Sequence, residues 1–521
     1  MRSSFAAIVS GIVTLPRAPL FCFVFFAAAL LAQIPQRAAH SAPQTKTTIP
    51  ALLISDIHFE PFWDPAKVPQ LAAAPTNEWR AILSAPPSPD QQQRFTALQQ
   101  SCRVRGVDTS FDLFDSTLKA MRSHAAGAKF VTISGDLISH GFDCKFKSLF
   151  PKAAPDDYRK FVEKTLDYVI DELYSTFPGV PVYAALGNND SDCGDYRLDA
   201  RSEFLRATGD EVTKGFPSAE RRTAEDSFFA GGYYSVALPA PIENARLLVL
   251  DDLFMSKSYS TCAGKADSSA ADEQIAWLQQ QLTQARAKRE KIWVMGHIPP
   301  GVDLYSTMKK MGDVCNSQPG MFLSSEKMTD VLAEFGDVVE LAVFAHTHMD
   351  ELRILKTGRS RYAAVADVKE FMTIPDFEHH MEEGPASDVA VKMVSSISPN
   401  HGNNPSFTLA QIDPATAALV DYRVFTASNQ TGVEAKWTEE YDFARSYHEQ
   451  TFSSSTVSKI IAGFASDPGV KTNPSQSYID NFSAGSPSPV LQIFWPQYVC
   501  ALSNYTAEGF KACVCPAPAS H

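Results

Sequence analysis

Six short, mainly apolar segments that end abruptly in polar residues constrain the fold of this chain more than any other feature. They cover residues 51–54, 130–133, 182–186, 246–250, 292–295 and 341–344. Runs of this length with polar ends are typical of strands buried on both faces of a sheet. Apolar residues at three- and four-residue steps predict helices over residues 111–121, 158–174 and 273–286. This alternation predicts an α/β domain whose functional residues lie at the carboxyl ends of the strands.

Polar residues with the chemistry of metal ligands follow most of these strands. Seven of them carry carboxylate, imidazole or amide groups: Asp56, His58, Asp136, Asn188, His297, His346 and His348. Alternate side chains of an extended segment share a face, so the pairs at 56 and 58 and at 346 and 348 would each point into one crevice. This donor set suits zinc, manganese or iron better than calcium or magnesium. Seven donors exceed the needs of one tetrahedral zinc ion, so we expect two divalent metal ions.

The first 42 residues have the pattern of a secretory signal peptide. Arg2 and Arg17 precede an apolar run over residues 19–32, and small residues follow it up to Ala42. The run is shorter than the roughly 20 residues that a membrane-spanning helix needs. An uncleaved N-terminal anchor is the alternative, but we expect cleavage and a secreted or periplasmic protein with no transmembrane segment.

Charge and cysteine content narrow the possible partners. The formal net charge is −13, and it becomes −16 without residues 1–42 because that segment has three arginines and no acidic residue. Such acidity argues against general binding of nucleic acids or anionic membranes. Without Cys22, eight cysteines remain, an even number that permits complete disulfide pairing in an oxidising compartment. Buried free thiols are the alternative for several of them.

The order of the motifs resembles that of the calcineurin-like metallophosphoesterases. They are D-x-H at 56–58, G-D at 135–136, G-N-x-D at 187–190, G-H at 296–297 and A-H-x-H at 345–348. Residues 135–140, 296–301, 344–351, 396–407 and 495–515 look like the acid sphingomyelinase branch. The resemblance implies a four-layer α/β/β/α sandwich over residues 47–412 and a small, mainly helical domain over residues 413–521. The residue pattern agrees, since we expect the strands to stop after Asp413 and helices to begin near Trp437.

The resemblance also implies roles for the ligand residues and for four cysteines. Both metal ions would be zinc, with manganese or iron as alternatives. One would be held by Asp56, His58 and His348, the other by Asn188, His297 and His346, with Asp136 bridging them. Cys262 would pair with Cys315, and Cys500 with Cys513. Cys102, Cys144, Cys193 and Cys515 stay unassigned.

The chain departs from the family pattern at two places. The family usually has a histidine after the metal-binding asparagine, where it protonates the leaving group. Here that residue is Asn189, whose amide cannot deliver a proton. His140 matches a histidine of the branch and becomes the candidate general acid, so His140 and Asn189 are the catalytic positions to examine. No cysteine-rich, lipid-extracting domain precedes Asp56, which argues against sphingomyelin as the substrate.

We therefore expect a secreted dinuclear-metal phosphoesterase, a phosphodiesterase ahead of a phosphomonoesterase. A metal-bridging hydroxide would attack phosphorus in line, on a small-molecule or lipid-headgroup phosphoester. An endopolyphosphatase-like hydrolase is one alternative, because relatives of that type also carry G-N-N-D. A catalytically silent, metal-stabilised binding module is another. Two further candidates are His401 for contact with substrate and Asp190 for orienting a ligand.

Overall fold

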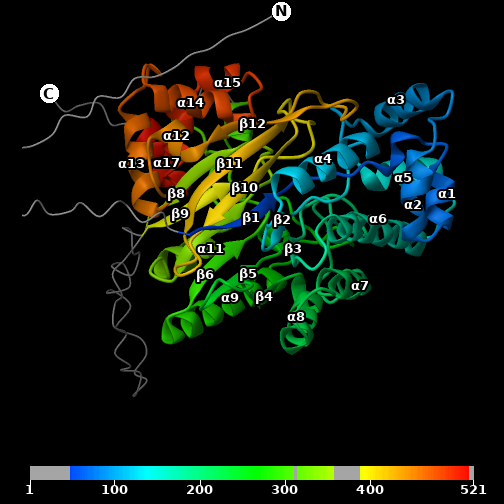
Figure 1. The fold of residues 1–521 in the computed structure, drawn as a ribbon, viewed down its shortest axis with the longest axis horizontal. Helices are drawn as coiled ribbons and strands as arrows, with labels where there is room; N and C mark the ends of the chain where they lie inside the picture. Colours follow the sequence, from blue (N-terminus) through cyan, green and yellow to red (C-terminus); the bar gives the residue numbers. More distant parts are fainter. Residues whose placement is uncertain (1–46, 310–313, 357–387, 516–521) are drawn as a thin grey trace, which may run out of the picture. The chain divides into compact units, whose positions relative to one another are not determined.

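The computed structural model describes residues 47–309, 314–356 and 388–515. The predicted signal peptide over residues 1–42 lies outside the described residues. Two sheets of six strands each form the centre of the molecule (Figure 1).

The first sheet has the strand order β12-β11-β10-β1-β2-β3. β1 is parallel to β2 and β2 to β3, whereas β10, β11 and β12 are antiparallel to their neighbours. The bounds are β1 Ile49–Ile54, β2 Val131–Ser134, β3 Val182–Ala185, β10 Ser406–Ile412, β11 Leu419–Ala427 and β12 Trp437–Asp442.

The second sheet has the strand order β4-β5-β6-β7-β9-β8. β5, β6, β7 and β9 run parallel, and β4 and β8 are antiparallel strands at the two edges. The bounds are β4 Tyr234–Ala237, β5 Ala245–Val249, β6 Lys291–Met295, β7 Val339–Phe344, β8 Glu351–Leu355 and β9 Val389–Met393.

Helices cover the outer faces of both sheets. Those that precede residue 310 are α1 Val68–Ala73, α2 Trp79–Ser84, α3 Gln91–Cys102, α4 Phe111–His124, α5 Phe142–Leu149, α6 Pro155–Thr176, α7 Glu203–Val212, α8 Ser218–Gly231, α9 Ser269–Lys288 and α10 Leu304–Met308. Later ones are α11 Lys327–Glu334, α12 Phe443–Tyr447, α13 Ser454–Ala465, α14 Asn473–Phe482, α15 Pro489–Ile493, α16 Trp495–Ala501 and α17 Ala507–Val514. α4 and α6 lie against the first sheet and α9 against the second, so the expected four-layer arrangement is confirmed (Figure 1).

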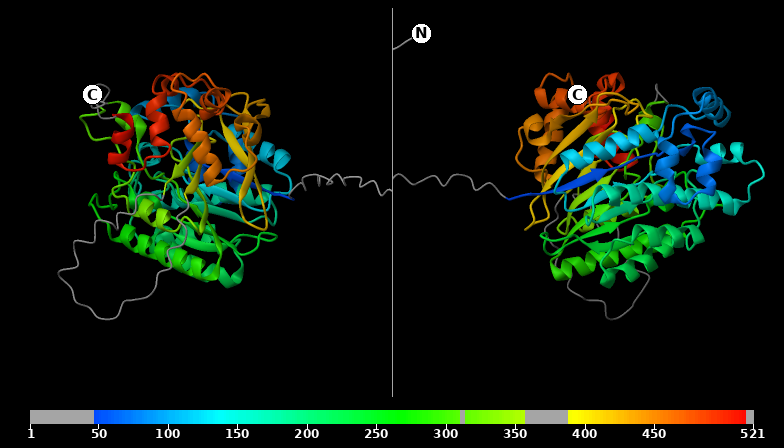
Figure 2. Two further views of the ribbon diagram at one scale, coloured as in Figure 1. Left: turned by 90° about the vertical axis from the view of Figure 1, so that its left-hand side faces the viewer. Right: turned by 45° about the vertical axis from the view of Figure 1, so that its right-hand side comes forward.

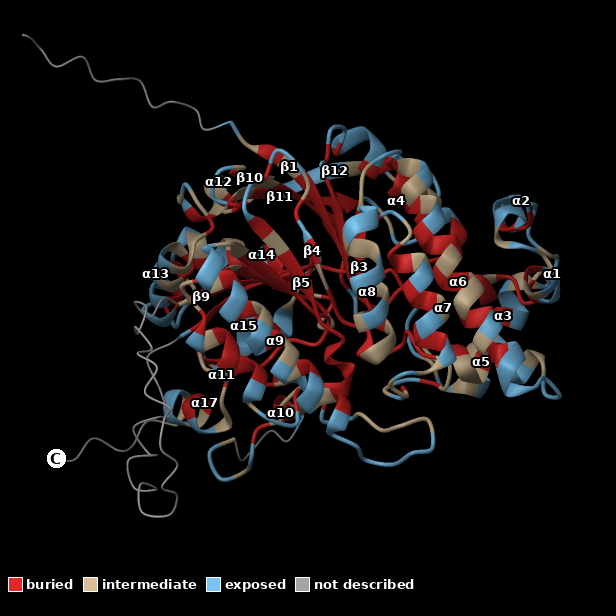
Figure 3. Cartoon of the chain, turned by 90° about the horizontal axis from the view of Figure 1, so that it is seen from below, coloured by how far each residue is buried: buried red, intermediate tan, exposed pale blue. Residues whose placement is uncertain are grey.

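The core lies between the two sheets and under the helices, where the strands are buried along nearly all of their length (Figure 3). Trp293 on β6 joins the sheets, because its indole N–H donates to the Ala417 carbonyl at 2.8 Å and its ring packs against Phe130. None of the helices in the described residues is both long and apolar enough to cross a membrane.

The predicted strands and helices before residue 412 are all present. The expectation that strands stop after Asp413 is wrong, because β11 and β12 extend the first sheet. β12 is an edge strand with the sequence WTEEYD, and three of its six residues are exposed. Such a segment has no apolar pattern of its own, and pairing with β11 decides its conformation. The boundary between two domains at residues 412 and 413 stays a prediction.

α13 packs against β8 and β9 at the edge of the second sheet, and the other C-terminal helices pack on α13 and on one another. This group lies on the opposite side of the molecule from α9 (Figure 2). Two backbone hydrogen bonds attach this tail to the edge strand: Asp350 N–H donates to Phe482 O at 2.8 Å, and Ile354 N–H donates to Leu502 O at 2.9 Å. The tail thereby covers polar groups that an edge strand otherwise leaves open.

Four disulfides join the eight cysteines. The expected pair Cys500–Cys513 is confirmed, and Cys102 pairs with Cys144. The expected pair Cys262–Cys315 is wrong, because Cys262 bonds Cys193 and Cys315 bonds Cys515. The loop that carries Cys262 lies beside residues 196–199, since Ser260 and Cys262 donate backbone N–H groups to Tyr196 and Asp199. The C-terminal residues reach Cys315 instead.

We expect Trp495→Ala to lower the free energy of unfolding by about 3–5 kcal/mol, the usual effect of deleting a buried tryptophan side chain. Trp495 is 1% exposed, donates its indole N–H to Asp467 O at 3.0 Å and packs against Phe464 and Tyr478. Denaturant unfolding measures the change. Ile493→Ala is the control, because Ile493 is 70% exposed in the neighbouring helix and its loss should cost less than about 0.5 kcal/mol. Equal effects of the two variants would contradict this packing.

Candidate metal centre

The seven candidate ligands lie in loops at the carboxyl ends of the central parallel strands. Asp56 and His58 follow β1, Asp136 follows β2, and Asn188 follows β3 of the first sheet. His297 follows β6 of the second sheet, and His346 and His348 follow β7. Their side chains meet where the ends of the two sheets face each other. All are buried except His346, which is partly exposed.

The backbone brings these side chains inward by a route that the sequence did not predict. Asp56 and His58 lie beyond the end of β1, and their φ angles are 44° and 45° rather than extended. Asp136, His346 and His348 also have positive φ angles, of 54°, 70° and 65°. Residues other than glycine rarely adopt positive φ angles, and such backbone strain concentrates at functional sites. Hydrogen bonds from Asp56 N–H to Gly135 O and from His58 N–H to Asp136 O hold the first loop in place.

A first set of donor atoms comes from Asp56, His58, His348 and Asp136. His58 Nε2 lies 3.1 Å from His348 Nε2, 3.5 Å from Asp136 Oδ2 and 3.8 Å from Asp56 Oδ1. His348 Nε2 lies 3.5 Å from Asp56 Oδ1. Donor atoms around a tetrahedral zinc ion are about 3.4 Å apart, because the zinc–nitrogen bond is about 2.1 Å long. The four donors have the spacing of ligands around a common ion.

A second set shares Asp136 with the first. His297 Nε2 lies 3.2 Å from Asp136 Oδ2, 3.2 Å from Asn188 Oδ1 and 3.3 Å from His346 Nδ1. The Oδ2 atom of Asp136 therefore faces one histidine from each sheet. The structure brings together all seven residues that the sequence singled out.

The hydrogen bonds of His58 and His297 show which ring nitrogen of each is free to bind a cation. The Nδ1 atoms of His58 and His297 lie 3.0 and 2.7 Å from the carbonyl oxygens of Ile138 and Ser134. A carbonyl oxygen only accepts, so each Nδ1 carries the proton and each Nε2 presents its lone pair to the centre. Asp56 Oδ1 is buried and has no hydrogen-bond partner among the described residues. An unpaired buried carboxylate oxygen beside imidazole lone pairs is the environment that a divalent metal ion satisfies.

The pKa values of these groups also indicate that the site binds positive charge. Burial disfavours a charged imidazole, but the surrounding carboxylates, Asp136 foremost and Asp56 with it, together outweigh burial and raise the pKa of His58 to about 9 and that of His297 to about 10. Burial alone would raise the pKa of Asp136, yet His297 and His58 hold that pKa well below its usual range. Burial and the charge of His297 lower the pKa of His346 to about 3. The metal-free centre attracts protons, which occupy places that a metal ion would fill.

Residues that follow Asn188 hold the ligands in place. Asn189 donates its backbone N–H to Asp136 Oδ1 at 2.8 Å and its side-chain Nδ2–H to Asp136 Oδ2 at 2.9 Å. Asp190 accepts backbone N–H groups from Gly187, Leu137 and Ile138 and so ties together the loops that follow β2 and β3.

The carboxylate of Asp195 hydrogen-bonds directly to the metal-ligand candidate Asn188. Asp195 accepts Nδ2–H of Asn188 at 2.7 Å, which leaves Oδ1 of that amide toward His297. The sequence ranked Asp190 ahead of Asp192 and Asp195 as the residue that orients a ligand, whereas in the structure Asp195 makes that contact. The amide orientation of Asn188 is the signal that identifies Asp195, and it exists only in the folded chain.

Two histidines that are not among the seven ligands flank the first donor set. The His140 ring stacks on the His58 ring with centroids 4.0 Å apart, and the His401 ring lies 4.2 Å from that of His348. His140 hydrogen-bonds to the buried carboxylate of Asp108, a residue that the motif pattern did not single out. On the other side, Tyr196 places its hydroxyl 3.2 Å from His346 Nε2, and Phe322 lies edge-on to the same ring.

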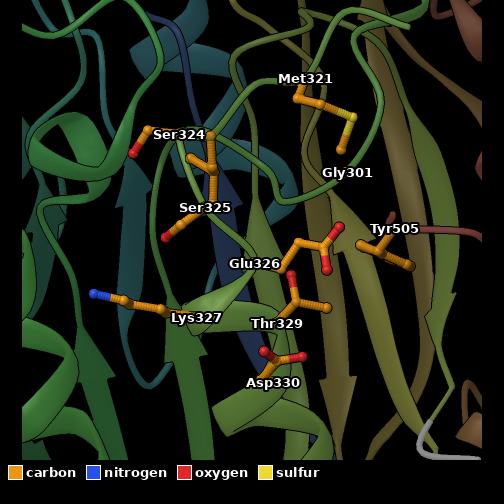
Figure 4. A pocket seen from close by; sticks show the side chains of 10 residues that line it. Gly301, Met321, Ser324, Ser325, Glu326, Lys327, Thr329, Asp330 and Tyr505 are labelled. Carbon is orange, nitrogen blue, oxygen red and sulfur yellow. The ribbon is translucent and has the colours of Figure 1, made fainter. Parts of the chain in front are cut away.

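Two hollows lie apart from this cluster. One of about 430 Å³ is lined by residues from Met321 to Asp330 together with Gly301 and Tyr505 (Figure 4). The other, of about 690 Å³, is lined by Ala72 and by residues from Phe146 to Asp167. Neither contains any of the seven candidate ligands. The candidate site is therefore defined by the convergence of polar side chains and not by either of these hollows.

Comparison with known proteins identifies the same chemistry. Residues 49–350 match the model of the Calcineurin-like phosphoesterase family. The chain is 21% identical over 417 residues to "Sphingomyelinase phosphodiesterase C" of Dictyostelium discoideum, covering 78% of this chain and 82% of that protein. It is 24% identical over 467 residues to "Acid sphingomyelinase-like phosphodiesterase 3b" of Mus musculus, covering 88% of this chain and 89% of that protein. It is also 24% identical over 350 residues to the cyclic GMP-AMP phosphodiesterase of Rattus norvegicus, covering 66% and 69%.

The family match spans more than half of the chain and contains all of the strand-end motifs, from Asp56 to His348. Its position agrees with the two sheets and with the buried cluster of carboxylates and imidazoles at their facing ends. This chain belongs to the calcineurin-like phosphoesterase family and is a metal-dependent hydrolase of phosphoric esters.

Proposed function

We propose that this protein is a secreted phosphodiesterase with two metal ions at the facing ends of its sheets. Asp56, His58 and His348 would hold one ion, and Asn188, His297 and His346 the other, with Asp136 between them. One observation carries the proposal: Asp136 Oδ2 faces His58 Nε2 at 3.5 Å and His297 Nε2 at 3.2 Å, from opposite sheets. Mixed nitrogen and oxygen donors favour zinc, with manganese or iron as alternatives.

When bound, the two cations would supply a hydroxide nucleophile near neutral pH and neutralise the charge of the phosphoryl oxygens during in-line displacement. The chain itself provides the remaining groups. His140 would donate a proton to the departing alkoxide, because its ring is partly exposed beside the first donor set. Asn189 would hold Asp136 and not transfer a proton, because both of its N–H contacts go to that carboxylate.

A diester of a small alcohol is the substrate class that we infer. The relatives named as phosphodiesterases support a diester, although they are only 21–24% identical to this chain. His401 would contact the substrate, because it is exposed at the rim and its ring lies 4.2 Å from that of His348. Four disulfides support an oxidising compartment, which agrees with secretion.

The test is a substrate panel with zinc-loaded protein. We expect faster turnover of bis(p-nitrophenyl) phosphate than of p-nitrophenyl phosphate, and no cleavage of long-chain polyphosphate. Cleavage of polyphosphate alone would favour the endopolyphosphatase-like alternative. Two bound metal equivalents without turnover of any phosphoester would favour a silent binding module.

We expect His140→Ala to lower kcat on a diester with an alkyl leaving group by about 10²–10⁴-fold, the usual contribution of a general acid. The loss should be much smaller with p-nitrophenolate, which leaves without a proton. Steady-state kinetics on matched alkyl and p-nitrophenyl diesters measures both values. His124→Ala is the control, because His124 is exposed at the end of α4 and packs against Phe425. Unchanged alkyl-ester turnover in His140→Ala would contradict the role of His140.

A further inference from the structure

We propose that Asp108 is the positioning residue of His140, an inference that rests on the proposed function of His140 as the general acid. The Asp108 carboxylate contacts His140 twice. Oδ2 accepts the backbone N–H of His140 at 2.9 Å, and Oδ1 lies 2.9 Å from Nδ1 of the ring. A carboxylate thus fixes both the backbone and the imidazole of one residue.

These contacts determine which ring nitrogen is available for chemistry. The Asp108 carboxylate accepts the proton of Nδ1, so the other nitrogen, Nε2, is the one that remains for a substrate. The ring stacks on that of His58 with an interplanar angle of 20°, and ring nitrogens of His58, His140 and His348 lie within 4.8 Å of one another. Asp108 therefore leaves Nε2 free in a ring that lies against the donor set that would bind the reacting phosphoryl group.

Asp108 is itself fixed in position by burial and by further hydrogen bonds. It is 2% exposed, and its Oδ1 also accepts from Ser398 Oγ at 3.0 Å and from Asn400 Nδ2 at 3.0 Å. The next residue pairs with the first ligand loop, because Thr109 N–H donates to His58 O and Thr109 O accepts from Glu60. These bonds fix the position of Asp108 relative to the chain segment that carries the ligand His58.

Its charge is also secured. Burial would raise the pKa of Asp108, but His140, with His58 and Lys145, outweighs burial and holds that pKa well below its usual range. The residue keeps a charged acceptor beside the imidazole, as four donors converge on it.

Close backbone contacts surround Asp108. A Cβ atom on Gly106 would lie 2.6 Å from Asn400 O, and one on Gly141 would lie 2.5 Å from Val104 Cγ2. Both glycines have positive φ angles, of 75° and 63°. The disulfide Cys102–Cys144 joins the two segments that lead to these contacts. The loop that precedes Asp108 is therefore seated against the His140 loop and against the loop that bears His401.

A role through His140 differs measurably from a merely structural role. A structural defect lowers turnover of every substrate, whereas a misdirected acid affects only leaving groups that need a proton. The effect of Asp108 should also depend on the presence of His140, because residues that act as one unit are not additive.

The experiment uses the zinc-loaded, full-length protein with matched alkyl and p-nitrophenyl diesters. We expect Asp108→Asn to lower kcat on the alkyl diester by about 10–100-fold, as loss of a ligand-orienting partner usually does, and on the p-nitrophenyl diester by less than about threefold. In a His140→Ala background the same substitution should change alkyl-ester turnover by less than about twofold. Asn400→Ala, which removes one donor to Asp108 and leaves the carboxylate, should give a smaller loss with the same selectivity.

Asp467→Asn is the matched control. Asp467 is 7% exposed and accepts hydrogen bonds from Lys471 and Thr472 in the tail, away from the histidines, so both diesters should be hydrolysed as by the unmodified protein. Equal losses on both diesters in Asp108→Asn, or an undiminished effect in the His140→Ala background, would overturn the inference. If Asp108→Asn does not fold, a non-selective loss in Asn400→Ala overturns it.

Failure of the proposed function has a different signature. Equal losses on both diesters in His140→Ala would contradict the acid role of His140, and the inference would fall with it. A selective loss in His140→Ala without one in Asp108→Asn contradicts the positioning role alone.

Discussion

Replacing Asp136 with asparagine is expected to lower kcat/KM on a phosphodiester by about 10³-fold or more, at the upper end of losses for one electrostatic group of an active site. Among the seven ligands, only Asp136 has a single oxygen atom, Oδ2, that faces a histidine from each of the two donor sets. Asparagine keeps the size of the side chain but removes its charge, so two cations would have to approach each other without the carboxylate between them. Activity should fall because the two ions lose the charged ligand that they share.

Two measurements check this prediction. Steady-state kinetics gives the loss in kcat/KM, and elemental analysis of the dialysed protein should show fewer than two metal equivalents. Asp337→Asn serves as the control, because that carboxylate pairs with Arg286 on the surface and should not change either value. Full metal content together with full activity in Asp136→Asn would rule out the bridging position.

Removal of the metal ions is the second large effect that we expect. Dialysis against a chelator should abolish turnover and lower the melting temperature, and added zinc should restore both. A ligand at 100 times its dissociation constant stabilises the folded state by about 2.7 kcal/mol per site, which is a large part of the stability of most proteins. Differential scanning calorimetry and activity assays on the chelated and reloaded protein measure the two effects. Retained turnover after complete metal removal would contradict a metal-dependent site.

The metal-free protein should also have a distinctive pH dependence. The pKa of His58 is raised to about 9 and that of His297 to about 10, so both bind protons more tightly in the folded state. Such groups stabilise the fold below their unfolded pKa of about 6.5 and lose that contribution as pH rises through 9 and 10. Stability of the chelated protein should therefore fall between pH 7 and pH 10. The zinc-loaded protein should lack this loss, because metal ions displace the protons.

The outcome for the ligands shows what a local pattern can predict. Each candidate ligand follows a strand whose apolar run is visible in the sequence, and strands β1, β2, β3, β6 and β7 are all present. Parallel strands place their carboxyl ends at one edge of a sheet, so the meeting of Asp56 with Asp136 follows from strand order alone. The meeting of those residues with His297 and His348 requires two sheets to pack face to face, which the family resemblance implied.

Asp56 and His58 point into one site, as expected, but not because they share one face of a strand. The pair was expected to share one face of an extended strand, yet Asp56 and His58 lie past the strand with positive φ angles. Hydrogen bonds to residues 135 and 136 hold that conformation. Because these bonds come from a neighbouring strand, no local property of residues 56–58 predicts them.

Long-range partners account for the remaining errors. Cys262 was paired with Cys315 by resemblance, whereas the folded chain brings Cys193 to Cys262 and Cys515 to Cys315. The residues of β12 were expected to be helical, but they pair with the edge strand β11 through backbone hydrogen bonds. In both cases the decisive contact joins segments that the motif pattern treats separately.

The sequence by itself determined the strand-end positions of the ligands, the mixed nitrogen and oxygen chemistry of the site and the absence of a histidine at residue 189. These are local properties, since apolar periodicity and residue type are read along the chain. Only the tertiary structure decided which residues hydrogen-bond to these groups. Asn189 donates to Asp136, and Asp195 accepts from Asn188. Asp108, which is 32 residues from His140, hydrogen-bonds to that candidate acid. Hydrogen-bond partners are chosen by which loops the packed sheets bring together, and spacing in the sequence carries no record of that choice.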